Sequence, residues 1–216
     1  DLVEATYTNR GTEAVTVLWM HLRRNLHKVG QMRTRVVAVT DGITLGEVSI
    51  DGDEINARAM GTRMALRIRG GIEPGASKTV RVEYSYPVPV AGTAPRNGHE
   101  ENRVFYLGYW YPQFAVRDDI EGWVCEEYKG NGEFYMPYGN YDVTFRAPAG
   151  FLVRSTGVLQ NAAEILHDEA LDRLAAAKTS REIQPVISKE DLAAGRVTKA
   201  KDGSVAWHYV AENVRD

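Results

Sequence analysis

A regular alternation of apolar and polar residues between positions 79 and 86 most constrains what this chain can fold into. The apolar positions are Val80, Val82, Tyr84 and Tyr86, and the polar ones are Thr79, Arg81, Glu83 and Ser85. Successive side chains of a β-strand point to opposite faces, so this pattern predicts a strand with one buried and one solvated face. A Pro74-Gly75 turn precedes it, in the order that type II turns prefer, and Pro87 ends it.

Strand patterns recur along most of the chain. Further strands are predicted at 15–20, 35–40, 43–50, 141–146, 151–154 and 205–210, and Met64, Leu66 and Ile68 share one face of another. A polar loop is predicted at 91–102, because its glycines, proline and charges suit solvent exposure.

One helical segment interrupts the β pattern. Asn161 can cap a helix over 162–177, in which Ile165, Leu166, Leu171 and Leu174 gather on one face. A second helical turn is predicted from Ser188, which has Asp191 three residues on, to Gly195. The prediction is therefore a mainly β chain, a sandwich of largely antiparallel sheets, with a small helical insertion at about 161–195. At 216 residues it is predicted to be a single domain, 1–216.

Charge and hydropathy exclude two classes of partner. The formal net charge is −3 and the pI is about 6.0, whereas nucleic-acid binders usually carry a basic excess. The longest apolar run, 15–20, is far too short for a membrane span. Cys125 is the sole cysteine, so no internal disulfide can form; the compartment stays open, with a periplasmic or secreted location favoured over a cytoplasmic one. Because the chain starts at Asp1 and has no evident stop at Asp216, we expect further segments at both ends.

No residue pattern predicts a catalytic, cofactor-binding or metal-binding residue in this chain. A zinc helix of the His-Glu-x-x-His type needs two histidines four residues apart, and no pair among the five has that spacing: His21, His27, His99, His167 and His208. Cys125 precedes Glu126-Glu127, whose negative charge is expected to raise the thiol pKa and make it a poor nucleophile. Phosphate-binding glycine loops and Gly-x-Ser-x-Gly elbows are also missing.

Two charged clusters allow alternative interpretations. A basic segment, His21, Arg23, Arg24, His27 and Lys28, fits either an exposed strand edge that discourages edge pairing or an anion site. An acidic group, Asp118, Asp119, Glu121, Glu126 and Glu127, lies near Trp110, Tyr111 and Trp123. A charged loop over an aromatic core is the favoured interpretation of the acidic group, against a paired-acid glycosidase site or a calcium loop.

The region from Phe105 to Tyr141 holds 12 of the 20 aromatic residues and carries a family resemblance. Its motifs are Tyr109-Trp110-Tyr111-Pro112-Gln113-Phe114, Asp118-Asp119, Gly122-Trp123, Gly132-Glu133-Phe134-Tyr135 and Gly139-Asn140-Tyr141-Asp142-Val143. Around it follow Pro148-Ala149-Gly150, Thr156-Gly157, Trp207-His208-Tyr209 and Glu212-Asn213-Val214-Arg215-Asp216, with Pro74-Gly75 and Val82-Glu83-Tyr84 upstream. In their order and spacing these motifs resemble the N-terminal domain of aminopeptidase N-like zinc metallopeptidases.

The resemblance implies a saddle-shaped β domain that packs on a thermolysin-like catalytic domain and helps shape its peptide-binding cleft. In the family, that second domain holds zinc with a His-Glu-x-x-His helix and a later Glu, and its partner is the peptide substrate. We therefore expect the catalytic domain and its zinc after residue 216, and no activity in this fragment alone. Some members also use a glutamine from the N-terminal domain; the corresponding stretch here, 102–107, has none, which puts peptide selectivity and ordinary aminopeptidase activity in doubt for the parent protein.

A second hypothesis is a carbohydrate-binding β-sandwich. Trp110, Tyr111 and Trp123 would then form a flat stacking platform for sugar rings. The two hypotheses differ in what they require of these rings, since a platform needs them exposed in one plane and a domain interface or core needs them packed.

Overall fold

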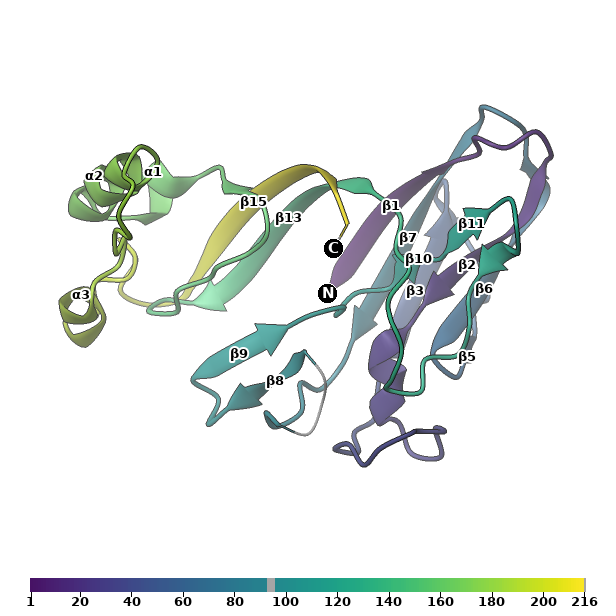
Figure 1. Ribbon diagram of the computed structural model, residues 1–216, viewed down its shortest axis with the longest axis horizontal. Coiled ribbons are helices and arrows are strands. Elements are labelled where there is room, and N and C mark those ends of the chain that lie inside the picture. Colours follow the sequence, from purple (N-terminus) through teal and green to yellow (C-terminus); the bar gives the residue numbers. More distant parts are fainter. Residues whose placement is uncertain (93–95, 216) are drawn as a thin grey trace. The chain divides into compact units, whose positions relative to one another are not determined.

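The computed structural model describes residues 1–92 and 96–215 and divides into two compact units, Asp1–Pro137 and Tyr138–Asp216 (Figure 1). Residues 93–95 of the predicted polar loop, and Asp216 in the last motif of the resemblance, lie outside the described residues. Each unit has its own hydrophobic core. The mainly β fold class is confirmed, while the single domain over residues 1–216 stays a prediction.

Two four-stranded antiparallel sheets build the first unit. One has the order β1 (Leu2–Thr8), β7 (Ser77–Ser85), β3 (Thr44–Ile50) and β4 (Asp53–Glu54). The other has the order β10 (Gln113–Phe114), β2 (Val15–His21), β6 (Arg63–Ile72) and β5 (Ala59–Met60). Both sheets contribute to one core cluster, so they face each other as a sandwich.

The alternation in β7 explains how its sheet joins this core. Val80 and Val82 are fully buried and Tyr84 nearly so, while Arg81 and Ser85 are exposed, as the sequence predicts. Fully burying one such apolar side chain contributes about 1.5–3 kcal/mol relative to leaving it in water. Met64, Leu66 and Ile68 of β6 do the same from the facing sheet.

Smaller elements flank the sandwich within the same unit. A short 3-10 helix, η1 (Arg23–His27), follows β2, and two hairpins pair β8 (Asn97–Glu100) with β9 (Val104–Leu107) and β11 (Val116–Asp118) with β12 (Gly122–Val124). The predicted polar loop at 91–102 thus contains a strand, β8. Its turn to β9 holds Glu101 and Asn102 at φ of 48° and 53°, the left-handed values that tight hairpin turns require.

The second unit is a three-stranded antiparallel sheet packed against helices. The strand order is β13 (Gly139–Pro148), β15 (Ser204–Val214) and β14 (Val158–Leu159). Three helices lie between β14 and β15 in sequence: α1 (Ala162–Ile165), α2 (Asp168–Ala177) and α3 (Lys189–Ala193). Figure 1 shows the helices gathered at one end of the long β13–β15 pair. Their core joins Ile165, Leu166 and Ala170 to Val205, Trp207 and Tyr209 of β15.

The predicted helix over 162–177 is interrupted at Leu166 and His167, which are both extended. Leu166 is buried in the core, and the backbone carbonyl of Ile165 accepts a hydrogen bond from Lys199 N (2.8 Å) instead of continuing the helix. Asn161 precedes α1 but does not cap it with its side chain. That amide bonds to the backbone of Ala206 and His208 in β15 (2.9 and 3.1 Å).

Two predicted strands, 35–40 and 151–154, are wrong. In the first, the backbone bonds elsewhere: Thr34 N donates to Lys129 O (2.9 Å) and Thr40 N to His27 O (2.8 Å). Val36 is 97% exposed there, so its β-branched side chain does not pack on the face of a sheet. In the second, the Phe151 amide makes a turn bond to Pro148 O (3.1 Å), and residues 151–155 have no regular structure.

Candidate functional site

Among the histidines and acidic residues, His208 and Asp118 each bond to a structural partner. Within the described ranges, no set of three or more His, Cys, Asp or Glu side chains is arranged to hold a metal ion. His167 opens α2, and His208 bonds through Nε2 to Asp142 Oδ1 (2.8 Å) across the β13–β15 pair. Asp118 accepts from the backbone N–H groups of Ile120 and Glu121 (3.1 and 2.8 Å), so it closes the β11–β12 turn. The contacts of Asp118 and His208 are therefore structural.

Cys125 is 8% exposed and lies in the interior of the first unit. Burial raises the pKa of its thiol to about 11. The direction agrees with the sequence-based expectation but the cause does not. The charges that act on the thiol are Arg63 and Arg23, which lower the pKa and are outweighed by desolvation. A thiol held this far from ionisation is a poor nucleophile at neutral pH.

The three rings proposed for a sugar platform do not form a plane. Trp110, Tyr111 and Trp123 are half-buried and pack against the sandwich core. The planes of Trp110 and Tyr111 meet at 69°, and Trp123 contacts the ring of Tyr7 at 5.6 Å. Carbohydrate stacking needs a flat exposed face, so this geometry favours a packing role for the aromatic segment.

The basic segment that begins at the end of β2 is the feature whose interpretation the structure changes most. The interpretation as an exposed strand edge is wrong, because His21, Arg23, Arg24 and His27 are 8%, 4%, 1% and 1% exposed. We call these four residues the buried basic cluster. His21 ends β2, the other three lie in η1, and the fully buried Leu22 and Leu26 are interspersed among them, which places the whole segment in the interior. The anion-site interpretation is the one that remains compatible with their positions.

Arg23 is held by a ring stack and one amide. Its Nη1 donates to Gln113 Oε1 at 2.5 Å, and its guanidinium carbon lies 5.6 Å from the Tyr109 ring centre and 4.9 Å from that of Phe134. The same two rings, whose centres are 4.0 Å apart, also contact Arg96 at 5.7 and 5.8 Å. Burial lowers the pKa of Arg23 to about 10, so the side chain still carries its charge at neutral pH.

Arg24 is the least satisfied member of the buried basic cluster. Its Nε and Nη1 are buried and make no hydrogen bond within the described residues. Burial lowers its pKa, and Tyr86, Tyr128 and Tyr109 act in the opposite direction. None of the groups acting on Arg23 or Arg24 is a carboxylate, and no ion pair among the described residues includes either one.

The two histidines of the cluster are neutral bases at pH 7. Burial, followed by the charge of Arg23, lowers the pKa of His21 to about 4. Burial also lowers the pKa of His27, and the charges of Arg24 and Arg33 act in the same direction. Its Nδ1 lies 2.8 Å from Ala38 O. His21 Nδ1 and His27 Nε2 are themselves buried without a partner among the described residues. The cluster therefore combines two guanidinium groups with several buried polar atoms that have no hydrogen-bond partner among the described residues.

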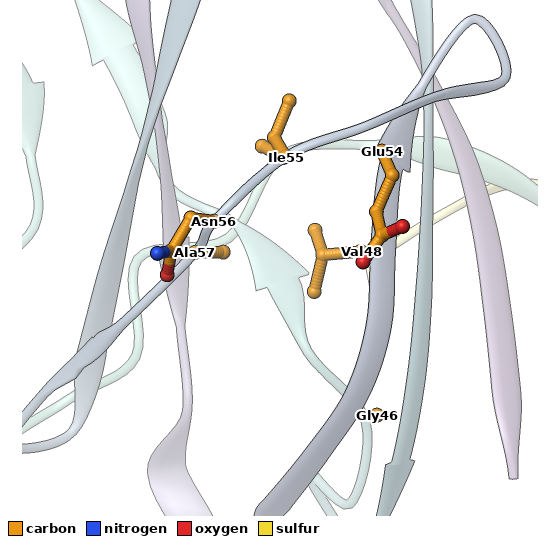
Figure 2. Close-up of a pocket in the computed structure, with 6 residues that line it drawn as sticks. All are labelled: Gly46, Val48, Glu54, Ile55, Asn56 and Ala57. Atoms are coloured by element: carbon orange, nitrogen blue, oxygen red, sulfur yellow. The ribbon is translucent and has the colours of Figure 1, made fainter.

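A hollow on the sandwich has no such concentration of polar groups. Six residues line it: Gly46, Val48, Glu54, Ile55, Asn56 and Ala57. Figure 2 shows the Glu54 carboxylate and the Asn56 amide on opposite sides of Val48 and Ile55. Binding sites for small molecules need polar groups that converge on one point, and these diverge.

Exposed apolar side chains gather on β9 and on the loop after η1. All four residues of β9, Val104, Phe105, Tyr106 and Leu107, are between 37% and 64% exposed. In the loop, Val29, Met32, Val36 and Val39 are between 57% and 97% exposed. The four in a row on β9 form a contiguous apolar stretch of the kind found at interaction surfaces, whereas the loop residues are spaced singly along the chain.

Sequence reasoning missed the burial of the basic cluster, although one signal was available. Leu22 and Leu26 bracket Arg23 and Arg24 and mark the segment as interior, but the charges alone suggested a solvated edge.

The described helices include none long and apolar enough to span a membrane. In comparisons with known proteins, no family model, no curated protein and no solved structure matches the chain.

Proposed function

We propose that this chain is the noncatalytic N-terminal domain of an aminopeptidase N-like zinc metallopeptidase. It packs on the catalytic domain that follows it and helps shape the peptide-binding cleft. Zinc and the residues that activate water belong to that second domain, and the substrate is a peptide. The ordered series of motifs from Pro74-Gly75 to Trp207-His208-Tyr209 is the basis for the family, and the mainly β fold is compatible with it.

The observation that carries the docking role is strand β9. A two-stranded hairpin is only marginally stable in water, and β9 has four apolar residues in a row with none buried. Covering them with a neighbouring domain would remove apolar surface from water at about 25 cal/mol per Å². The hairpin contains the stretch 102–107, from which some family members supply a glutamine near the substrate's amino end.

The experiment compares full-length protein with and without an apolar β9. The double substitution Val104→Ser and Tyr106→Ser removes two side chains that are 64% exposed and that the folded first unit does not need. We expect faster hydrogen exchange across β9, a weaker association of the two domains after limited proteolysis, and a raised KM for peptide. The matched control, Val158→Ser with Ile183→Ser, changes residues that are 62% and 98% exposed elsewhere. Equal behaviour of the two double variants would count against docking through β9.

A further inference from the structure

The buried basic cluster has a charge that the first unit does not neutralise. Arginine stays protonated in proteins, and Arg23 and Arg24 are 4% and 1% exposed with no carboxylate acting on either. Isolated charges in a protein interior are costly, so buried arginines are normally paired. The Tyr109 and Phe134 rings and the Gln113 amide ease the cost for Arg23, but Arg24 Nε and Nη1 have no acceptor within the described residues.

Water could occupy such atoms but would leave the charge in place. A buried water molecule satisfies donors by hydrogen bonding, whereas the excess here is electrostatic. An anion meets both needs, since it accepts from the unpartnered Arg24 N–H groups and its charge offsets that of the guanidinium. His21 and His27, neutral at pH 7, add no charge and leave the cluster with the two arginines as its cations.

We propose that the buried basic cluster is a binding site for a single small inorganic anion of halide size, held by Arg24 and supported by Arg23. Burial decides between a free ion and a side chain from another protein. Arg24 is 1% exposed, so an aspartate or glutamate from a partner would have to carry its own backbone into a closed interior, whereas a halide is a single atom. The site stabilises the fold of the first unit and is independent of the proposed docking through β9.

The test uses the whole chain and exchanges chloride for gluconate at constant ionic strength. Chloride that binds the folded state only must raise Tm with a saturable dependence on its concentration. Arg24→Met removes the charged guanidinium group and keeps most of the side-chain volume, so the chloride-dependent shift in Tm should be lost. Arg69→Met, which replaces an exposed arginine in the same unit, should keep it. Equal Tm in chloride and gluconate for the unsubstituted chain would overturn the proposal.

A second measurement does not depend on the variant folding. The ³⁵Cl linewidth of a chloride solution should broaden on adding the unsubstituted chain and narrow again on competition with bromide. Crystals grown in bromide should show an anomalous peak within hydrogen-bonding distance of Arg24 Nε or Nη1. Absence of broadening, or a bromide found only at exposed arginines, would mean that water alone occupies the cluster.

Discussion

At the scale of single residues, the interior of the first unit holds two arginines without an opposite charge among the described residues. Together with the neutral His21 and His27 they form the buried basic cluster, and desolvation is the largest influence on the pKa of each of the four. Desolvation similarly dominates for Cys125. The sequence could predict that histidine, arginine and cysteine side chains are present. It could not predict that burial would control their pKa values.

His21 provides a pH test at this scale. Its pKa is about 4 when folded and about 6.5 when unfolded, so between these values the unfolded chain binds more protons. The free energy of unfolding should therefore fall as pH is lowered from 6.5 to 4, by about 3 kcal/mol at most from this group. Above pH 6.5 both states are neutral at His21 and the dependence should vanish.

Urea unfolding between pH 4 and 7.5 measures this dependence. His27, whose pKa is also lowered by burial, adds to the slope with the same sign. In His21→Gln the slope should shrink; His167→Gln, at the start of α2 and outside the buried basic cluster, is the matched control. An unchanged slope in His21→Gln would show that this histidine is not buried in the way described.

At the scale of elements, short-range patterns predict the fold where one face is buried and the other solvated. The alternation of β7 and the shared face of Met64, Leu66 and Ile68 were both confirmed by burial. The strand predicted at 35–40 was wrong because β-branched composition does not provide a neighbour to pair with. The helix over 162–177 was interrupted because the burial of Leu166 and a bond to Lys199 outweigh local propensity.

The helix α3 allows a test of predicted capping. Ser188 accepts from Asp191 N (3.1 Å) and Asp191 Oδ2 accepts from Ser188 N (3.0 Å), which is the reciprocal box expected from the sequence. Ser188→Ala should lower the free energy of unfolding of the second unit by about 1 kcal/mol. Hydrogen exchange over residues 138–215 in urea would measure it, with the exposed Ser204→Ala as control. Equal loss in both variants would argue against the box.

At the scale of the whole molecule, the described residues form two hydrophobic cores, and the apolar strand β9 is exposed. The mainly β class was predictable because the period-two pattern recurs along the sequence. The division at Pro137 was not, since no linker composition marks it. The candidate site was predictable only as one of two alternatives, because the same basic residues suit a surface or an interior and tertiary burial decides between them.

The most direct test of the proposed role is a paired measurement of zinc content and of aminoacyl-reporter cleavage. Full-length protein expressed from the complete gene should bind one zinc ion through a His-Glu-x-x-His helix encoded after residue 216, and any cleavage of the reporter should require that zinc. The 1–216 chain, prepared in parallel, should bind no stoichiometric zinc and cleave nothing. Zinc-dependent cleavage by the 1–216 chain, or a full-length protein without the zinc motif, would contradict the account.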